Sequence, residues 1–173
     1  AANGNVVVDF VKDGSPCHLG GAAACQAAGL TKQQMLDFNA GAWGAVLEGT
    51  VNAVTFAASA RTMVGAGAWS YRLRGPVVTQ ILVEDVSRPS PAYDFGWECS
   101  GGAWQAPSAD KFKSVHPLFT LSFYAGWSGV EVEAMAQNPW TTRGQRQVFD
   151  LAVKRGADGA TSVYSKAGFE LPW

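Results

Sequence analysis

The feature that most constrains the fold is a pair of alternating runs on either side of a short turn. In the run 118–127 every second side chain is apolar, and after Ser128 and Gly129 the alternation resumes. Alternation of this kind places successive side chains on opposite faces of a strand and buries one face. The two runs therefore predict an antiparallel hairpin. Its predicted core residues are Phe119, Leu121, Phe123, Val130 and Val132.

Short β-branched runs, separated by glycine and proline, recur along the rest of the chain. They cover residues 5–11, 43–60, 68–74, 77–86, 93–99, 147–154 and 161–169. Gly49 suggests a bulge or bend within the long run 43–60, and residues 105–116 resemble a loop. Eight or nine strands of this kind predict a mainly β fold, an antiparallel sandwich or jelly roll, as a single domain over 1–173.

One segment has the signals of a helix. Thr31 and Gln34 fit a capping box, in which the threonine hydroxyl accepts from the Gln34 amide and the glutamine side chain bonds back. Gly41 is a natural stop. These residues predict one short helix over 32–39.

The charge balance excludes some classes of protein. The chain has 13 basic and 14 acidic residues, a net charge of -1. A nucleic-acid binder carries a basic excess or stripe, so we expect no nucleic-acid partner. No apolar run reaches the roughly 18 residues of a membrane span, which predicts no transmembrane segment. The first residues lack the basic and apolar stretches of a signal peptide, which leaves open whether one was removed.

The residues that could bind a metal or act as nucleophiles are poorly spaced for either task. They are Cys17, His18, Cys25, Cys99 and His116. None forms a C-x-x-C or H-x-x-x-H pattern, and the chain has no G-x-S-x-G or phosphate-binding loop. We therefore predict no metal site, no cofactor and no enzymatic activity. The cysteines leave two interpretations open, a Cys17–Cys25 disulfide or three small buried hydrophobic residues.

Glu131 and Glu133 are the one carboxylate pair that could suggest a glycosidase. They lie on one face of a predicted strand, roughly 7 Å apart by the strand repeat. Because they alternate with apolar residues, a solvated strand face is the favoured interpretation.

Four of the seven tryptophans stand beside or close to glycine or proline near predicted strand ends. They are Trp97, Trp127, Trp140 and Trp173. Tryptophans in such places act as interface anchors or as platforms for sugar rings. The alternative is that they close the ends of the sandwich.

The segment from Val51 to Ala60 has neither charge nor proline. An edge strand in a monomer is normally protected by such residues, so an interface with another chain is predicted here. Overall, charged residues make up only 16% of the chain, against about 25% in a typical domain. The other interpretation is a central strand covered within its own fold. The predicted interface residues are Val51, Ala53, Thr55, Trp97, Trp127, Trp140 and Trp173.

In length, strand count, low charge and lack of catalytic residues, the chain resembles the single jelly-roll capsid proteins of tailless icosahedral viruses. The likeness is to the small major capsid protein of phages with an internal membrane. It implies a virion subunit that assembles with itself, with a second capsid protein as a further candidate partner. An alternative hypothesis is a secreted, lectin-like carbohydrate-binding sandwich, which the tryptophans suggest. Oligomer size in solution would discriminate between the two.

Overall fold

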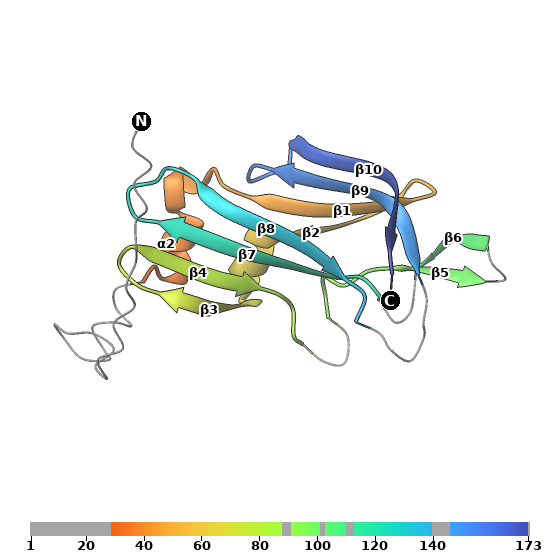
Figure 1. Ribbon diagram of the computed structural model, residues 1–173, viewed down its shortest axis with the longest axis horizontal. Helices are drawn as coiled ribbons and strands as arrows, with labels where there is room; N and C mark the ends of the chain where they lie inside the picture. Colours follow the sequence, from red (N-terminus) through yellow and green to blue (C-terminus); the bar gives the residue numbers. More distant parts are fainter. Residues whose placement is uncertain (1–28, 88–90, 101–102, 110–112, 140–145, 173) are drawn as a thin grey trace, which may run out of the picture.

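Two four-stranded antiparallel sheets form a β-sandwich, and a two-stranded hairpin projects from one end of it (Figure 1). The computed structural model describes residues 29–87, 91–100, 103–109, 113–139 and 146–172. Sheet A has the order β10-β9-β1-β2, and sheet B has the order β3-β4-β7-β8. The predicted mainly β, antiparallel sandwich is confirmed. The expected strand at 5–11 lies outside the described residues.

The strands are short and follow one another closely in the chain. Their bounds are β1 (Ala45–Val51), β2 (Val54–Ser59), β3 (Trp69–Arg74), β4 (Val78–Val83), β5 (Trp97–Ser100), β6 (Ala103–Ala109), β7 (His116–Tyr124), β8 (Val130–Gln137), β9 (Gln147–Arg155) and β10 (Thr161–Leu171). The helical elements are α2 (Lys32–Leu36), the 3-10 turn η1 (Phe38–Gly41) and α3 (Ala60–Ala66). No helix in these described parts is long and apolar enough to cross a membrane.

Hairpins between consecutive strands build both sheets. The pairs β1–β2 and β9–β10 lie side by side in sheet A, and β3–β4 and β7–β8 lie side by side in sheet B. A jelly roll consists of two Greek keys, in which a fourth strand returns beside the first of three. In a jelly roll these keys carry successive strands from one sheet to the other, whereas here consecutive strands pair within each sheet. Among the described strands the architecture is therefore a sandwich of hairpins.

The hairpin predicted from the alternating runs is confirmed as β7–β8. Leu121 pairs with Val132 and Phe123 with Val130. The side chains of Leu121 and Phe123 are buried between the sheets, as is that of Phe119. Val130 and Val132 are partly buried and pack against this core.

The single long strand predicted over 43–60 is wrong, because the chain reverses in the middle of it. β1 ends at Val51, β2 begins at Val54, and those two residues pair directly. Asn52 and Ala53 form the two-residue turn, with φ of 49° and 65°. Positive φ at both turn positions is the type I′ geometry, whose twist matches that of the strands it joins.

Gly49 does not mark a bulge, and that prediction is also wrong. The pairing of β1 with both of its neighbours continues through Gly49 without a shift. Gly49 faces the core, where an added Cβ would lie 2.9 Å from ring atoms of Phe95 and Trp97. Glycine is needed here because two aromatic rings pack directly against the strand backbone.

The capping box of α2 is confirmed, but this helix is shorter than predicted. The Gln34 amide donates to the Thr31 hydroxyl, and the Thr31 amide donates to the Gln34 side chain. The helix ends at Leu36, and Asn39 and Ala40 then adopt positive φ within η1.

Two elements were not expected from the sequence. α3 makes a second α-helix where only one was predicted, and it begins where the Ser59 hydroxyl accepts from the Thr62 amide. It buries Met63 and Val64 at one end of the core. The predicted loop over 105–116 is wrong for its first part, because residues 105–109 belong to β6.

Candidate functional site

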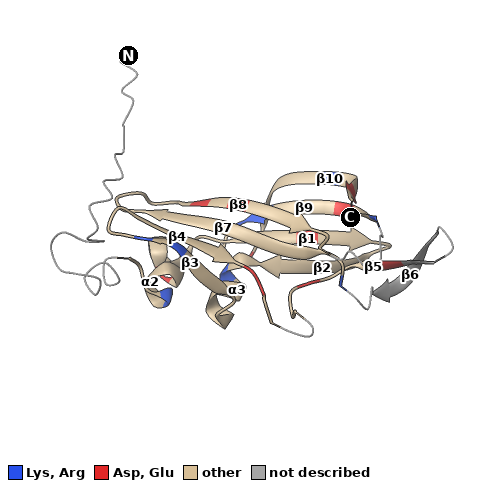
Figure 2. Ribbon diagram, turned by 60° about the horizontal axis from the view of Figure 1, so that its bottom comes forward, with Lys and Arg blue, Asp and Glu red and all other residues tan. Residues whose placement is uncertain are grey.

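β2 is an edge strand with a free side. Among the described strands it pairs only with β1, and it carries no charged residue or proline. Figure 2 shows it without basic or acidic residues along its length. The interpretation of 51–60 as a central strand is therefore wrong for β2, although Val51 itself ends the central strand β1.

The side chains of β2 are small on the outer face and large on the inner one. Thr55 and Ala57 are exposed on the outer face. The Thr55 hydroxyl lies 2.8 Å from that of Thr50 on β1. On the inner face the Phe56 ring stacks parallel to Phe95 at 5.9 Å and meets Trp97 edge-on at 5.6 Å. The strand is thus anchored to the core while its free edge is flat and uncharged.

The predicted interface residues fall in different places. Ala53 is exposed in the β1–β2 turn, and Val51 is partly buried beside it. Trp97 is only 1% exposed and lies in the core, so its prediction as an interface anchor is wrong. Its position beside Gly96 suggested a strand end. Instead, its ring packs with those of Phe56, Phe95 and Phe149, because Gly49 leaves room for the rings. Trp140 and Trp173 lie outside the described residues.

Trp127 is 64% exposed, at the tip of the β7–β8 connection. Its ring lies 5.0 Å from that of Tyr124. The neighbouring β3–β4 turn brings Val77, 70% exposed, alongside, because the Ala125 amide donates to the Val77 carbonyl. These residues form a second uncovered surface, which we call the Trp127 tip. Val77 was not expected there, since only the strand pairing brings the two turns together.

The third uncovered surface lies on β10, the other edge of sheet A. Val163 and Tyr164 are 57% and 49% exposed, next to an irregularity in the pairing with β9. Sequence reasoning missed both, because a local pattern of valine and tyrosine does not show that their strand lies at the edge of its sheet.

His116 sits between two carboxylates at the start of β7. Its Nδ1 lies 2.8 Å from the Asp94 Oδ1, and its Nε2 lies 3.8 Å from the Glu84 Oε2. The hydrogen bond to Asp94 raises the pKa of His116, and the charges of Asp94 and Glu84 add to this against the opposing effect of burial. Since the Asp94 side chain is nearly buried, the pair ties the loop before β5 to sheet B.

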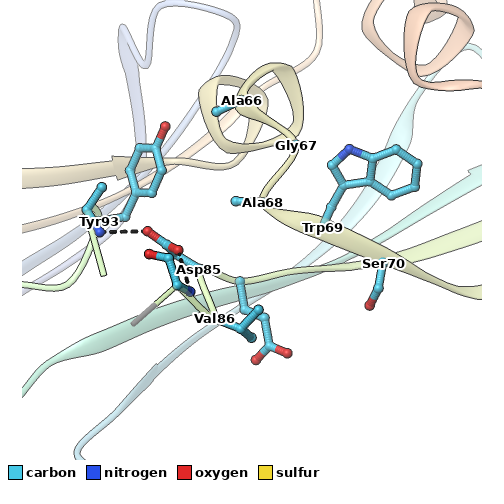
Figure 3. Close-up of a pocket in the computed structure, with 11 residues that line it drawn as sticks. Ala66, Gly67, Ala68, Trp69, Ser70, Asp85, Val86 and Tyr93 are labelled. Atoms are coloured by element: carbon cyan, nitrogen blue, oxygen red, sulfur yellow. Dashed lines mark hydrogen bonds between the residues drawn. The ribbon is translucent and has the colours of Figure 1, made fainter. Parts of the chain in front are cut away.

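A cavity of about 490 Å³ opens beside the end of α3 (Figure 3). Trp69, Tyr93 and Glu84 contribute to its lining. The Asp85 carboxylate at its floor accepts hydrogen bonds from the backbone amides of Ser87 and Ala92, at 2.9 and 2.6 Å. Burial opposes ionisation of Asp85, but hydrogen bonds from the Ser87 side chain and from the amides of Ser87, Ala92 and Tyr93 together outweigh it and lower the pKa of Asp85. This carboxylate therefore holds the loop in place.

Glu131 and Glu133 are exposed on the outer face of β8, which confirms the solvated strand face. The Tyr124 hydroxyl donates to Glu131 at 2.9 Å, which raises the pKa of Tyr124. Among the described residues, no three histidines, cysteines or acidic groups form a potential metal site. Cys17, His18 and Cys25 lie outside the described residues, and the Cys99 side chain is not described.

No protein-family model, curated protein or solved structure matches the chain.

Proposed function

We propose that this protein is a structural subunit that assembles with copies of itself, in the manner of a viral capsid protein. The observation that carries the proposal is that three separate surfaces of one small sandwich are left uncovered by the described residues. They are the free edge of β2, the Trp127 tip, and the exposed pair Val163 and Tyr164 on β10. A subunit of a closed shell must contact several neighbours through different surfaces, whereas a simple dimer needs one.

The composition supports the same proposal. Interfaces between subunits are depleted in charge and enriched in aromatic residues. The strand β2 is uncharged, and the Trp127 tip combines a tryptophan with a tyrosine. The virion is the location that this proposal implies, and a second capsid protein is a candidate partner for a surface that self-association leaves free.

The test is the mass of the purified protein in solution. Size-exclusion chromatography with light scattering should give a mass several times that of the 18.3 kDa chain. Negative-stain electron microscopy should then show closed or regular particles. A monodisperse monomer at high micromolar concentration would refute the proposal.

A secreted carbohydrate-binding module is the second candidate, and the Trp127 tip favours it. An exposed indole next to a tyrosine whose hydroxyl bonds to Glu131 offers a stacking platform beside a polar group. A glycan-array signal lost in Trp127→Ala but retained in Trp69→Ala would support this function. A monomer without any glycan binding would contradict both candidates.

A further inference from the structure

β2 differs from the other sheet edges in lacking protection against strand pairing. Exposed edges in monomeric proteins usually carry charged side chains, prolines or bulges. β2 has no charge and no proline. Its register with β1 is unbroken from Val46 and Ser59 to Val51 and Val54. Its backbone is therefore a regular, open template for another strand.

The other three edges carry the features that β2 lacks. The pairing of β3 is irregular once and that of β10 twice. All three edges are charged. Their charged residues are Arg72 and Arg74 on β3, Glu131 and Glu133 on β8, and Lys166 and Glu170 on β10. This contrast within one molecule indicates that β2, unlike the other three edges, is a surface for pairing with another strand.

The charges also indicate which strand would occupy the edge. If β3 paired with β3 of a second copy, its arginines would approach the arginines of that copy. If β8 paired with β8 of a second copy, its glutamates would likewise approach glutamates. β2 can meet itself without any like-charge contact. Its exposed outer residues Thr55 and Ala57 are small, so two copies can approach without steric conflict. The charge on that face nearest to Ala57, Glu48 of the neighbouring β1, is neutralised by Lys154 at 2.8 Å.

We infer that β2 pairs in antiparallel fashion with β2 of a second copy across a two-fold axis. The two four-stranded A sheets then join into one continuous sheet of eight strands, a width that natural open sheets reach. The pairing is isologous, since both copies use the same edge. This inference rests on the proposed function, because it names one of the contacts through which the subunits assemble.

The experiment compares two doubly substituted proteins with the wild type. Thr55→Lys with Ala57→Lys puts two lysines on the outer face of β2. Met135→Lys with Gln137→Lys puts two lysines on exposed positions of β8, an edge of sheet B that belongs to none of the three uncovered surfaces. Light scattering gives the mass of each protein, and circular dichroism reports its folding. The β2 variant should lose at least one two-fold contact and halve in mass or fall to the monomer, while the β8 variant keeps the wild-type mass.

Hydrogen exchange of the wild type provides a second readout that does not depend on a variant folding. Amides of residues 54–59 should exchange more slowly in the assembled protein than at dilutions where it dissociates, and amides of β3 should not change. An oligomer whose mass neither variant alters, or whose residues 54–59 gain no protection, overturns the β2 pairing but leaves self-assembly standing. A wild type that is monomeric at high concentration overturns both.

Discussion

The Nδ1 atom of His116 lies 2.8 Å from the Oδ1 atom of Asp94, although 22 positions separate the two residues in the chain. The contact joins the start of β7 to the loop that leads into β5. Glu84, at the end of β4, faces the other ring nitrogen at 3.8 Å. A protonated imidazole can donate to one carboxylate while it is attracted by the other, so the charged form is favoured in the folded protein.

The stability of the folded protein should therefore depend on the charge of His116. Its folded pKa lies above its ordinary value of 6.5. The stabilising contribution is complete below about pH 6.5 and is lost as the pH rises through the folded pKa. The free energy of unfolding in urea should fall more between about pH 6 and pH 9 for the wild type than for His116→Gln. Since His18 is present in both proteins, its titration cancels in the comparison.

The role of Asp94 in raising the pKa of His116 can be tested separately. Asp94→Asn removes the nearer charge and should lower the pKa of His116, measured by NMR titration of its ring proton. If the pKa is the same with and without Asp94, the carboxylate does not hold the imidazole.

Leu121→Ala should destabilise the protein by about 2–5 kcal/mol, as buried leucine-to-alanine changes do. Leu121 has no exposed surface and lies on the inner face of β7. The control is Leu73→Ala on β3 of the same sheet, where the side chain is 48% exposed and the loss should stay within about 0.5 kcal/mol. Equilibrium urea unfolding measures both. Equal losses would mean that β7 is not a core strand.

Gly49→Ala should also destabilise, by about 1–3 kcal/mol, because the new methyl group overpacks the core. Its Cβ would lie 2.9 Å from atoms of Phe95 and Trp97 and 3.1 Å from Phe149. The control is Gly129→Ala, where no atom lies within 4 Å of the added Cβ. A difference of less than about 0.5 kcal/mol between the two variants would show that the aromatic rings do not pack against β1.

Local patterns predicted those parts of the fold whose partners lie nearby in the chain. The alternation around residue 128 predicted β7–β8, and the runs 147–154 and 161–169 predicted β9 and β10. The turn between these two strands holds Gly156 and Gly159, both with positive φ. The capping box located α2. By contrast, α3 spans seven residues, too few to show a helical period. Trp97 and Phe95 gather around Gly49 from distant parts of the chain, so no local pattern could reveal this aromatic core.

The candidate site was predicted in the same partial way. The lack of charge from Val51 to Ala60 is visible in the sequence, and most of this segment forms the edge strand β2. That β2 is an edge while β1 is central depends on which strands pair across the fold, and β9 takes its place beside β1 from a hundred residues away. Strand order is not encoded locally, so the sequence left both interpretations open.

The β1–β2 turn itself went unrecognised because it contains no glycine. Ala53 adopts a φ of 65°, in the left-handed region that costs an alanine about 1–2 kcal/mol. Ala53→Gly should remove this strain, offset by about 0.4–1 kcal/mol of added freedom in the unfolded chain. We therefore expect a net gain of roughly 0.5–1 kcal/mol in the free energy of unfolding.

The control for this prediction is Ala152→Gly in the middle of β9, where the backbone is extended and glycine should cost about 0.5–1 kcal/mol. Urea unfolding of the two variants at one low protein concentration keeps any effect of assembly constant. Opposite signs are expected, because only Ala53 occupies a conformation that favours glycine. If Ala53→Gly destabilises as much as Ala152→Gly, then residues 51–55 are extended, β2 does not fold back on β1, and the free edge on which the proposed pairing depends does not exist.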